Sequence, residues 1–533
     1  MEYRGPLPDI EIPNVALYDL LFAERSDADW DRTAFVHPET GASLTYRQVK
    51  HDTDAVATWL AAHGVGPGDA VAIDLQNCPD YAAAFHGIAR TGAATSPVNP
   101  AAIASEIARQ LTETRSRFVI TSQALLGKVA EAATLAGLAP EAVIVLEGAA
   151  GHTSWVELLA TTPDLPQVSI DPATQLVCLP FSSGTSGLPK AVMLTHRNLV
   201  ANLLQFNEVL AGMGADNAIV AFLPYSHIYG MTTNLNYGLF RGFPQFTMSS
   251  FAPPAFLEII ATHRPTLLFI VPPVAAFLAK HPAARGVSWA SVKLIVSGAA
   301  PLDGAIGELI QERLGTRVVQ GYGMTELSPV THVIPPERRD IDLGTIGPAI
   351  PNVRFRVVDP DTGLDVAPPT SGESQPGELW CTGPNAMVGY LGSPVDADAV
   401  LDADGWVHTG DLVTVDADGV VRIVDRIKEL IKRRGFQVAP AELEALLCAH
   451  PAVADAGVLG LASSTPGEQI PHALVQLREG AEVSASELIH WLADQVAGYK
   501  RLGGVTFIDK VPRSAAGKVL RRELPKAHAA ANA

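Results

Sequence analysis

The chain is poor in cysteine. Its 533 residues include only Cys78, Cys178, Cys381 and Cys448, and no two of these have Cys-x-x-Cys spacing. We therefore expect neither a disulfide framework nor a cysteine-ligated zinc site, and a reducing compartment suits the sequence.

Long hydrophobic runs are also missing. The longest stretch without charge, residues 217–240, is interrupted by Asn, Ser, His, Pro and Gly, and the more apolar residues 265–279 are too short to span a bilayer. The N-terminus, MEYRGPLPDIEIP, lacks the basic and apolar segments of a signal peptide. These features predict a cytoplasmic protein without a transmembrane segment.

Positive charge is scarce. Lys and Arg total 38 against 56 Asp and Glu, which gives a formal net charge of −18 at pH 7. A protein whose main role is to hold nucleic acid needs a positive field, so no nucleic-acid partner is expected. The hydrophobic fraction of 47% is enough for large buried cores and excludes global disorder.

The first part of the chain carries patterns typical of layered α/β structure. Apolar runs at residues 70–73, 118–121, 267–270 and 294–296 read as buried strands, and helical patterns lie between them. The clearest helical pattern begins after Thr45, which can cap it. Such alternation indicates doubly wound α/β layers.

The pattern changes after about residue 340, where Pro and Gly become dense. Two apolar strands flank Asp416-Ala-Asp-Gly419, which predicts a hairpin within a β-rich subdomain. A basic segment then leads into an α+β pattern. We place a domain boundary near Asp425, so that residues 1–425 form a large N-terminal domain and residues 426–533 a small, mobile C-terminal domain. The small-residue tail, 527–533, is expected to fray.

The sharpest local signal is Ser182-Ser-Gly-Thr-Ser-Gly-Leu-Pro-Lys190. Its glycines free backbone N–H groups to face an anion, while hydroxyls and Lys190 add donors and a charge. It is not a Walker A loop, because a strand pattern follows Lys190 and a helix starts only after Thr195. The motif predicts a phosphate held in a strand–loop–strand turn; the alternative is a flexible surface turn.

The second signal is Gln320-Gly-Tyr-Gly-Met-Thr-Glu326. The two glycines let the backbone approach a flat ring on which Tyr322 can stack. Thr325 offers a hydroxyl, and Glu326 is a hard oxygen ligand suited to Mg²⁺. A turn with an ordinary solvated glutamate would give the same local pattern.

Two isolated charged residues complete this set. Asp411, which follows a glycine turn, can accept two hydrogen bonds from a ribose diol. Lys518, which follows a glycine near the C-terminus, can bring a cation to a distant site on a flexible loop. Each alone also fits a turn residue or a solvated side chain. Together with the two motifs they supply what an ATP site needs.

With these motifs the chain resembles the adenylate-forming superfamily of acyl-CoA synthetases, peptide-synthetase adenylation domains and beetle luciferases, and most closely its 4-coumarate–CoA ligase branch. The motifs SSGTSGLPK, QGYGMTELSPV, GWVHTGD, VDRIKELIKRRGFQVAPAELE and VPRSAAGKVLRREL carry the resemblance, which runs from about residue 15 to 525. It implies an AMP-forming acid–CoA ligase that uses ATP, Mg²⁺ and coenzyme A. The acid would be activated as an acyl-adenylate and then transferred to the CoA thiol.

The resemblance also assigns the ATP site. The residues that would hold the phosphates are Ser182, Ser183, Gly184, Thr185, Ser186, Gly187 and Lys190. Those that would hold the rest of Mg·ATP are Gln320, Gly321 and Tyr322 at the adenine, Thr325 at the α-phosphate, Glu326 at Mg²⁺, and Asp411 and Arg426 at the ribose. Lys518 would be the adenylation lysine, which bridges the acyl carboxylate and the α-phosphate.

For the C-terminal domain, the resemblance implies a rotation between the two half-reactions. Lys428 would be the hinge. The face presented for thioester formation would comprise Lys432, Arg434, Gly435 and Gln437. Catalysis would then depend on domain motion. The alternative for this basic run is the solvated start of an amphipathic helix.

The resemblance places the acyl pocket at three segments. They contribute a gating histidine, His227; walls at Tyr229, Gly298 and Ala299; and a far end at Gly323, Pro329 and Val330. These small and apolar residues suit a flat aromatic acid of the cinnamate, coumarate or benzoate type. A medium- or long-chain fatty acid remains an alternative, because apolar pockets discriminate poorly between similar shapes. His227 also fits a hydrogen-bonded structural histidine.

The thiol acceptor is open in one respect. Arg433-Arg434, Ser250 and Gly498 depart from the family pattern on the expected CoA side. A stand-alone acyl-AMP ligase that loads a carrier protein is therefore an alternative to the CoA ligase. An inactive binding module is disfavoured, because the charged and polar residues of the expected machinery are all present.

Overall fold

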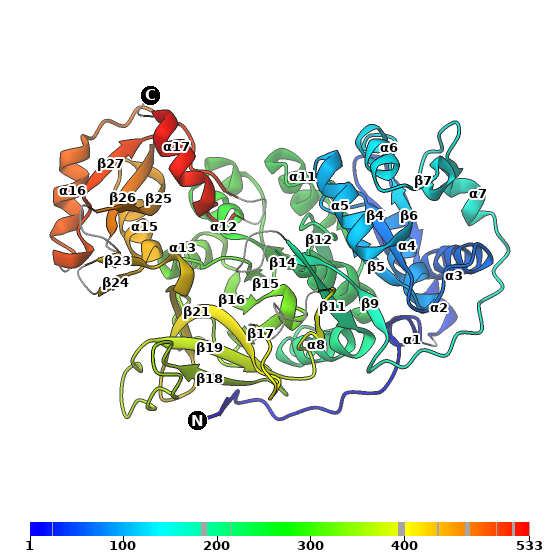
Figure 1. Cartoon of the computed structure of the whole chain (residues 1–533), viewed down its shortest axis with the longest axis horizontal. Coiled ribbons are helices and arrows are strands. Elements are labelled where there is room, and N and C mark those ends of the chain that lie inside the picture. The colour runs from blue at the N-terminus through cyan, green and yellow to red at the C-terminus, as the bar shows by residue number, and fades with distance from the viewer. Residues whose placement is uncertain are drawn as a thin grey trace.

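The computed structural model describes residues 1–23, 25–182, 189–214, 216–392, 400–433, 436–463, 469–496, 498–513 and 517–531, without the side chains of Lys428, Lys432, Phe436 and Gln437. Figure 1 shows the N-terminal half as α/β layers on the right, a β-rich sheet at the lower left and the C-terminal residues at the upper left. The N-terminal segment runs along the lower edge from α1 to β18.

A largely parallel sheet forms the first α/β layer, in the order β10-β11-β9-β5-β4-β6-β7-β8, with β20 paired to β11. Its strands are β4 (Ala70–Asp74), β5 (Ala94–Pro97), β6 (Ser116–Thr121), β7 (Val143–Val145), β8 (Thr153–Ser154), β9 (Leu176–Cys178), β10 (Phe181–Ser182), β11 (Lys190–Thr195) and β20 (Gly389–Tyr390). Its helices are α3 (Tyr46–Ala62), α4 (Asp80–Arg90), α5 (Ala104–Thr114), α6 (Leu126–Leu135) and α7 (Trp155–Leu159). The strands predicted at residues 70–73 and 118–121 are confirmed as β4 and β6.

Helix α3 starts where the sequence predicts. The Thr45 hydroxyl accepts the Gln48 N–H at 3.2 Å, and the Gln48 side chain accepts the Thr45 N–H at 2.8 Å. This capping box satisfies backbone donors that the first helical turn leaves unpaired. The helix buries Tyr46 and Val49 and packs against α4.

The second α/β layer is a sheet in the order β17-β16-β15-β14-β12-β13-β2-β3. Its strands are β2 (Thr33–His37), β3 (Ala42–Thr45), β12 (Ile219–Ala221), β13 (Gln245–Thr247), β14 (Leu267–Ile270), β15 (Leu294–Ser297), β16 (Arg317–Gly323) and β17 (Val330–Val333). Its helices are α1 (Leu17–Leu21), α2 (Asp27–Trp30), α8 (His196–Val209), α9 (Ile228–Gly230), α10 (Tyr237–Arg241), α11 (Pro253–His263), α12 (Pro272–Lys280) and α13 (Gly304–Leu314). The strands predicted at residues 267–270 and 294–296 are β14 and β15.

An antiparallel sheet follows, in the order β1-β18-β19-β21-β22. Its strands are β1 (Tyr3–Arg4), β18 (Arg354–Val358), β19 (Gly377–Thr382), β21 (Val407–Val415) and β22 (Val421–Arg426). The hairpin predicted around Asp416-Ala-Asp-Gly419 joins β21 to β22. Gly419 has a φ of +78°, a conformation that glycine adopts without strain.

The C-terminal residues form a separate α+β unit. Its elements are β23 (Ile431–Arg433), β24 (Phe436–Val438), α15 (Pro440–Ala449), β25 (Val453–Ala462), β26 (Gln469–Leu477), α16 (Ala485–Ala493), β27 (Gly504–Phe507) and α17 (Leu524–Ala531). The predicted fraying of the tail is wrong as far as Ala531. Helix α17 is held there because Leu524 is fully buried against Leu459, Leu474 and Val511.

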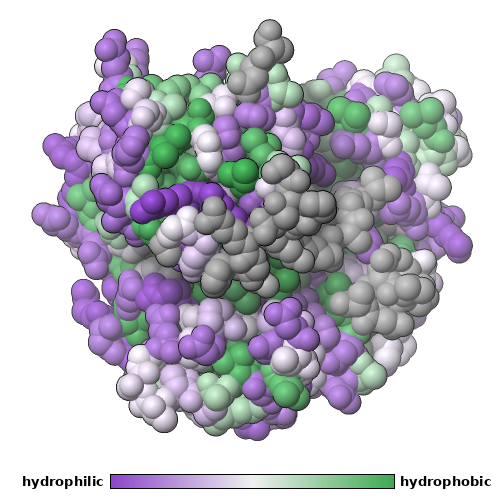
Figure 2. Space-filling model, turned by 60° about the vertical axis from the view of Figure 1, so that its left-hand side comes forward, coloured by the Kyte–Doolittle hydropathy of each residue, from purple (hydrophilic) through white to green (hydrophobic). Residues whose placement is uncertain are grey.

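The predicted fold class is thus confirmed: layered α/β subdomains, a β-rich subdomain and a small C-terminal α+β unit. The domain boundary near Asp425 stays a prediction. Asp425 lies in β22, and its carboxylate accepts the Ala441 N–H of α15 at 2.9 Å. Within the described chain, every helix is too short or too polar to cross a bilayer. Figure 2 shows apolar residues on one face as separate patches among polar ones.

Candidate active site

The predicted phosphate turn begins and ends on paired strands. Ser182 of β10 lies directly opposite Lys190 of β11, and α8 begins only after Thr195. This bears out the strand expected after Lys190 and the helix expected after Thr195. The predicted phosphate-binding residues Ser183, Gly184, Thr185, Ser186 and Gly187 lie outside the described residues.

Glu326 lies beside Ser182, the last described residue before the glycine-rich motif. It belongs to a 3₁₀ turn, η4 (Thr325–Leu327), and only 3% of it is exposed. The Ser182 hydroxyl donates a hydrogen bond to Glu326 Oε1 at 2.6 Å. The structure therefore brings the start of the phosphate turn and the predicted Mg²⁺ ligand into contact. Thr325 precedes Glu326 in the same turn and is partly exposed.

Asp411 and Arg426 face each other across β21 and β22. Arg426 Nε lies 2.9 Å from Asp411 Oδ1, and Tyr322 Oη donates to Asp411 Oδ2 at 2.5 Å. Burial and the Asp411 charge hold the Tyr322 pKa well above its ordinary value, so the phenol remains a donor. The neighbouring Asp411 carboxylate raises the Arg426 pKa. The predicted ring platform and the two predicted ribose residues therefore form one hydrogen-bonded cluster.

The Gln320 side chain has a structural role. Its Nε2 donates to the carbonyls of Leu343 at 3.2 Å and Thr345 at 2.7 Å. Its Oε1 accepts the Leu302 N–H at 2.5 Å. The amide thus ties two loops, one at Leu302 and one at residues 343–345, to the middle of β16, where Gly321 follows it. The predicted contacts of Gln320 and Gly321 with adenine stay predictions.

Lys518 reaches this cluster from the far end of the chain. Burial and the positive charge of Arg426 lower its pKa, while the negative charges of Asp411 and Glu326 act in the opposite direction. The preceding Gly517 has a φ of +79°, and a Cβ there would lie 2.5 Å from Pro273 Cδ. Only glycine lets the backbone pass α12 this closely. The structure therefore brings Lys518 into electrostatic range of the predicted ATP-site residues.

His227 precedes α9 and caps it. Its Nδ1 accepts the Tyr229 N–H at 3.2 Å, so Nε2 carries the proton in the neutral ring. Desolvation, together with the nearby Lys518 charge, lowers the His227 pKa to about 4. The structural hydrogen bond weighed for His227 is therefore present. It orients a neutral imidazole on the Lys518 side of the site.

Tyr229 forms a wall beside β14 and β15. Its hydroxyl donates to the carbonyls of Val296 at 3.1 Å and Ile270 at 3.3 Å. A Cβ on Gly298 would lie 3.0 Å from Tyr229 Cζ, so the ring rests against the glycine backbone. Ala299 follows with a φ of +71°. Tyr229, Gly298 and Ala299, which were predicted to share a pocket wall, are adjacent in the structure.

Gly323, Pro329 and Val330 also meet. A Cβ on Gly323 would lie 1.9 Å from the Pro329 carbonyl oxygen, and that oxygen accepts the Met324 N–H at 3.0 Å. Pro329 and Val330 are buried. Glycine at position 323 is therefore required by the backbone crossing itself, whichever acid is bound.

The predicted thioester residues lie elsewhere. Lys432 of β23 pairs with Gln437 of β24, and Lys428 belongs to a 3₁₀ turn, η5 (Ile427–Glu429). In Figure 1 the β23–β24 hairpin lies at the outer lower side of the C-terminal unit, away from α12 and the start of α17. Arg434 and Gly435 lie outside the described residues.

The family model of the AMP-binding enzymes matches residues 22–391, and that of the AMP-binding enzyme C-terminal domain matches residues 442–518. The chain belongs to the AMP-binding enzyme family. It is 37% identical to 4-coumarate–CoA ligase 5 of Oryza sativa subsp. japonica, over 98% of this chain and 96% of that protein. It is 36% identical to 4-coumarate–CoA ligase 2 of Solanum tuberosum, with the same coverage. The crystal structure of ATP-bound MatB from Rhodopseudomonas palustris superposes with a TM-score of 0.87 at 27% identity, covering 96% of this chain and 99% of that chain. The family resemblance drawn from the motifs is confirmed.

One residue at the site of this AMP-binding enzyme, Tyr390, was not predicted from the sequence. Tyr390 is buried beside Glu326, and its hydroxyl donates to Glu326 Oε1 at 2.8 Å. Lys190 Nζ lies 5.4 Å from the centre of its ring. In the sequence, Gly389-Tyr390 is an uncharged pair in an apolar stretch, so nothing local distinguishes it from a core residue.

The Glu326 environment fits a partly hydrated Mg²⁺. A buried carboxylate held by hydroxyl donors is a hard, oriented oxygen ligand. Among the described residues there is no cluster of three or more His, Cys, Asp or Glu side chains that could cage a metal. An ion at Glu326 would therefore be held jointly with the substrate phosphates, as Mg²⁺ prefers.

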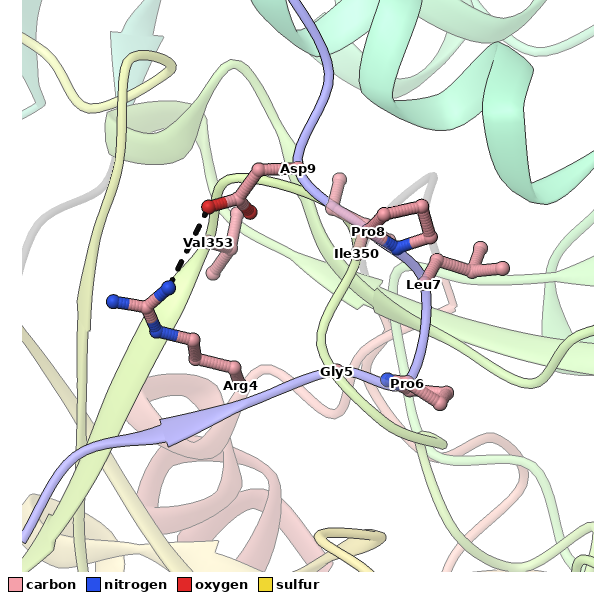
Figure 3. Close-up of a pocket in the computed structure, with 8 residues that line it drawn as sticks. All are labelled: Arg4, Gly5, Pro6, Leu7, Pro8, Asp9, Ile350 and Val353. Carbon is pink, nitrogen blue, oxygen red and sulfur yellow. Dashed lines mark ion pairs between the residues drawn. The ribbon is translucent and has the colours of Figure 1, made fainter.

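Two surface cavities are lined by other residues. One, of about 320 Å³, is enclosed by the N-terminal segment over Ile350 and Val353 (Figure 3). Its charged groups, Arg4 and Asp9, pair with each other at 3.6 Å. The other, of about 370 Å³, lies where the antiparallel sheet meets the C-terminal unit, and there Lys500 Nζ donates to both Glu442 oxygens at 2.7 Å. Neither is lined by a predicted site residue.

Proposed function

We propose that this protein activates a flat aromatic carboxylic acid, of the hydroxycinnamate or benzoate class, and passes the acyl group to coenzyme A. Membership of the family indicates an ATP-dependent, AMP-forming acid–thiol ligase. The acid class and the residue roles are the proposal.

The reaction has two steps. The substrate carboxylate attacks the α-phosphate of ATP, the bond to the β-phosphate oxygen breaks, and pyrophosphate leaves. The deprotonated CoA thiol then attacks the acyl carbonyl, and AMP leaves with the electron pair of the acyl–oxygen bond. Two anions must meet in the first step, so cationic groups that act at the transition state lower its barrier. Mg²⁺ at Glu326, when bound, would neutralise phosphate charge.

The position of Lys518 carries this proposal. Its charge lowers the pKa of His227, which lies beside the proposed acyl pocket. The charges of Asp411 and Glu326, on the proposed nucleotide side, act on the Lys518 pKa in turn. The Lys518 cation therefore lies between the proposed acyl and nucleotide sites, where an acyl carboxylate and an α-phosphate would meet. Asp411, oriented by Tyr322 and Arg426, offers the acceptor oxygens for a ribose diol.

The aromatic acid is supported by the aromatic wall of the proposed pocket. Tyr229 is pinned by two backbone carbonyls, and its ring lies against Gly298 without an intervening side chain. The Tyr229 ring itself fills the space beside Gly298, so this wall presents a fixed aromatic ring against which a planar acid can stack. The curated relatives named 4-coumarate–CoA ligase support the same class.

Acid-dependent pyrophosphate release, measured with and without CoA, tests the proposal. The panel contains benzoate, anthranilate, cinnamate, 4-coumarate, octanoate and palmitate. We expect turnover with at least one ring acid, dependent on CoA and accompanied by AMP. Preference for octanoate or palmitate would overturn the aromatic assignment. Adenylate that CoA fails to discharge, but a phosphopantetheinyl carrier protein accepts, would overturn the CoA assignment.

A further inference from the structure

Tyr390 occupies a junction between two distant parts of the chain. Strand β20 pairs with β11, so Tyr390 lies opposite Val192. The neighbouring Leu391 N–H donates to the Ala191 carbonyl at 2.9 Å. The backbone of Tyr390 is therefore fixed to the strand that begins with Lys190. Only 4% of the residue is exposed.

The hydroxyl of Tyr390 shares one oxygen of Glu326 with a second donor. Glu326 Oε1 accepts from Tyr390 Oη at 2.8 Å and from Ser182 Oγ at 2.6 Å. The Glu326 backbone carbonyl also accepts the Met387 N–H at 2.8 Å, from the segment that leads into β20. A buried carboxylate is costly unless it is hydrogen-bonded, and these donors fix both its position and its rotation. With Oε1 engaged by two donors, Oε2 is the oxygen that a cation would take.

The ring of Tyr390 faces a second charged group. Lys190 Nζ lies 5.4 Å from the ring centroid, within the range of a cation–π interaction. Lys190 ends the proposed phosphate turn, and Glu326 is the proposed Mg²⁺ ligand. Tyr390 therefore contacts both Lys190 and Glu326. The distance between these two groups would determine where Mg²⁺ lies relative to the phosphates.

We propose that Tyr390 is a positioning residue of the nucleotide site, whose hydroxyl aligns Glu326 for Mg²⁺ and whose ring holds Lys190 for the phosphates. This inference rests on the proposed function, because Glu326 must bind the metal for its alignment to matter. Ser182 contributes the second donor. The two contacts of Tyr390 are separable by substitution, because phenylalanine keeps the ring and loses the hydroxyl.

The test measures ATP binding by calorimetry without acid, so that no turnover occurs, over a series of Mg²⁺ concentrations and in EDTA. Tyr390→Phe should raise the Mg²⁺ concentration for half-maximal enhancement of ATP affinity roughly tenfold, as expected for loss of a hydrogen bond to a charged group. Its ATP affinity in EDTA should match wild type. Tyr390→Leu, which also removes the ring, should lower ATP affinity in EDTA as well.

Two controls separate the possible failures. Tyr46→Phe removes a buried hydroxyl that donates to two carbonyls at 3.1 Å, on α3, and should leave the Mg²⁺ profile unchanged. Glu326→Gln should abolish the Mg²⁺ enhancement. If it does not, the metal assignment, and with it the proposed role of Glu326, is wrong. If Glu326→Gln behaves as expected but Tyr390→Phe keeps the wild-type profile, only the positioning role is wrong.

A purely structural role for Tyr390 would give a different result. ATP affinity would then fall by the same factor at every Mg²⁺ concentration and in EDTA, together with the melting temperature, and the proposal would be overturned. If Tyr390→Phe does not fold, Ser182→Ala removes the other donor to the same oxygen. An unchanged Mg²⁺ profile in Ser182→Ala would likewise overturn the alignment of Glu326 through Oε1.

Discussion

Two regions of the C-terminal unit differ in where they lie relative to the nucleotide cluster. The segment that carries Lys518 packs against α12 and brings its cation within range of Asp411 and Glu326. The β23–β24 hairpin, with Lys432 and Gln437, lies at the outer side of the same unit. The two sets of predicted residues therefore do not occupy the site together. The proposal that this unit presents both sets, one after the other, therefore requires it to move between the half-reactions.

The largest expected effects come from removing one lysine from each of the two regions. Lys518→Ala should slow adenylation by about 10²–10³-fold, the range for removal of one oriented group that stabilises transition-state charge, and should spare thioester formation from supplied acyl-adenylate. Lys432→Ala should do the reverse. Single-turnover assays of each half-reaction measure both. Equal losses in both half-reactions for either variant would contradict the division between the two regions.

A substitution at Gly517 should keep Lys518 from approaching the nucleotide cluster without removing its charge. Gly517→Ala places a Cβ 2.5 Å from Pro273 Cδ and strains a residue with a φ of +79°. We expect adenylation to fall at least about tenfold, because relief of the contact with Pro273 displaces the neighbouring Lys518, while the thioester step from supplied adenylate continues. The left-handed conformation adds a strain of roughly 1–2 kcal/mol.

Gly480→Ala is the matched control for this experiment. Gly480 has a φ of +73°, but a Cβ there would meet nothing within 4 Å. Gly480→Ala should therefore share the backbone strain and lower the melting temperature without a selective loss of adenylation. If both alanine variants lose adenylation to the same extent, the contact with Pro273 is not what positions Lys518.

Loss of the hydrogen bond between Tyr322 and Asp411 should affect both half-reactions, unlike the substitutions in the two C-terminal regions. Tyr322→Phe removes the 2.5 Å hydrogen bond to Asp411 but keeps a ring. Both half-reactions use the adenosine moiety, so we expect KM for ATP and for acyl-adenylate to rise together, roughly tenfold. Steady-state kinetics of each half-reaction check this, with Tyr46→Phe as the control. A change confined to one half-reaction would contradict a shared nucleoside site.

The sequence was most informative where structure is local. Thr45 and Thr195 cap helices through residues three positions away, so their signals could be read from short windows. The motifs placed Ser182 and Glu326 in one site from their chemistry. They did not predict the hydrogen bond between the two side chains. The role of Tyr390 could not be predicted, because its partner Glu326 lies 64 residues away and the pairing depends on β20 crossing to another sheet.

The large region and the C-terminal unit should also differ in acid sensitivity, with a smaller effect. His86, in α4, is fully buried, and its ring nitrogens have no hydrogen-bond partner within the described structure. Burial, with a contribution from His196, lowers its pKa to about 3. Burial also lowers the His332 pKa to about 3. In the C-terminal unit, His472 is partly exposed and has its pKa lowered by burial and His528.

The sign follows from proton linkage. The unfolded chain protonates His86 near its ordinary pKa of about 6.5, whereas the folded protein resists protonation down to about pH 3. The free energy of unfolding should therefore fall by about 1.4 kcal/mol per pH unit for this residue as the pH drops below about 6.5, and be unaffected above it. His86→Leu should remove that share of the slope between pH 6 and 4 in urea titrations. Hydrogen exchange at pH 5 should show the large region opening before the C-terminal unit; the opposite order, or an unchanged slope in His86→Leu, would show that these histidines do not set the acid limit.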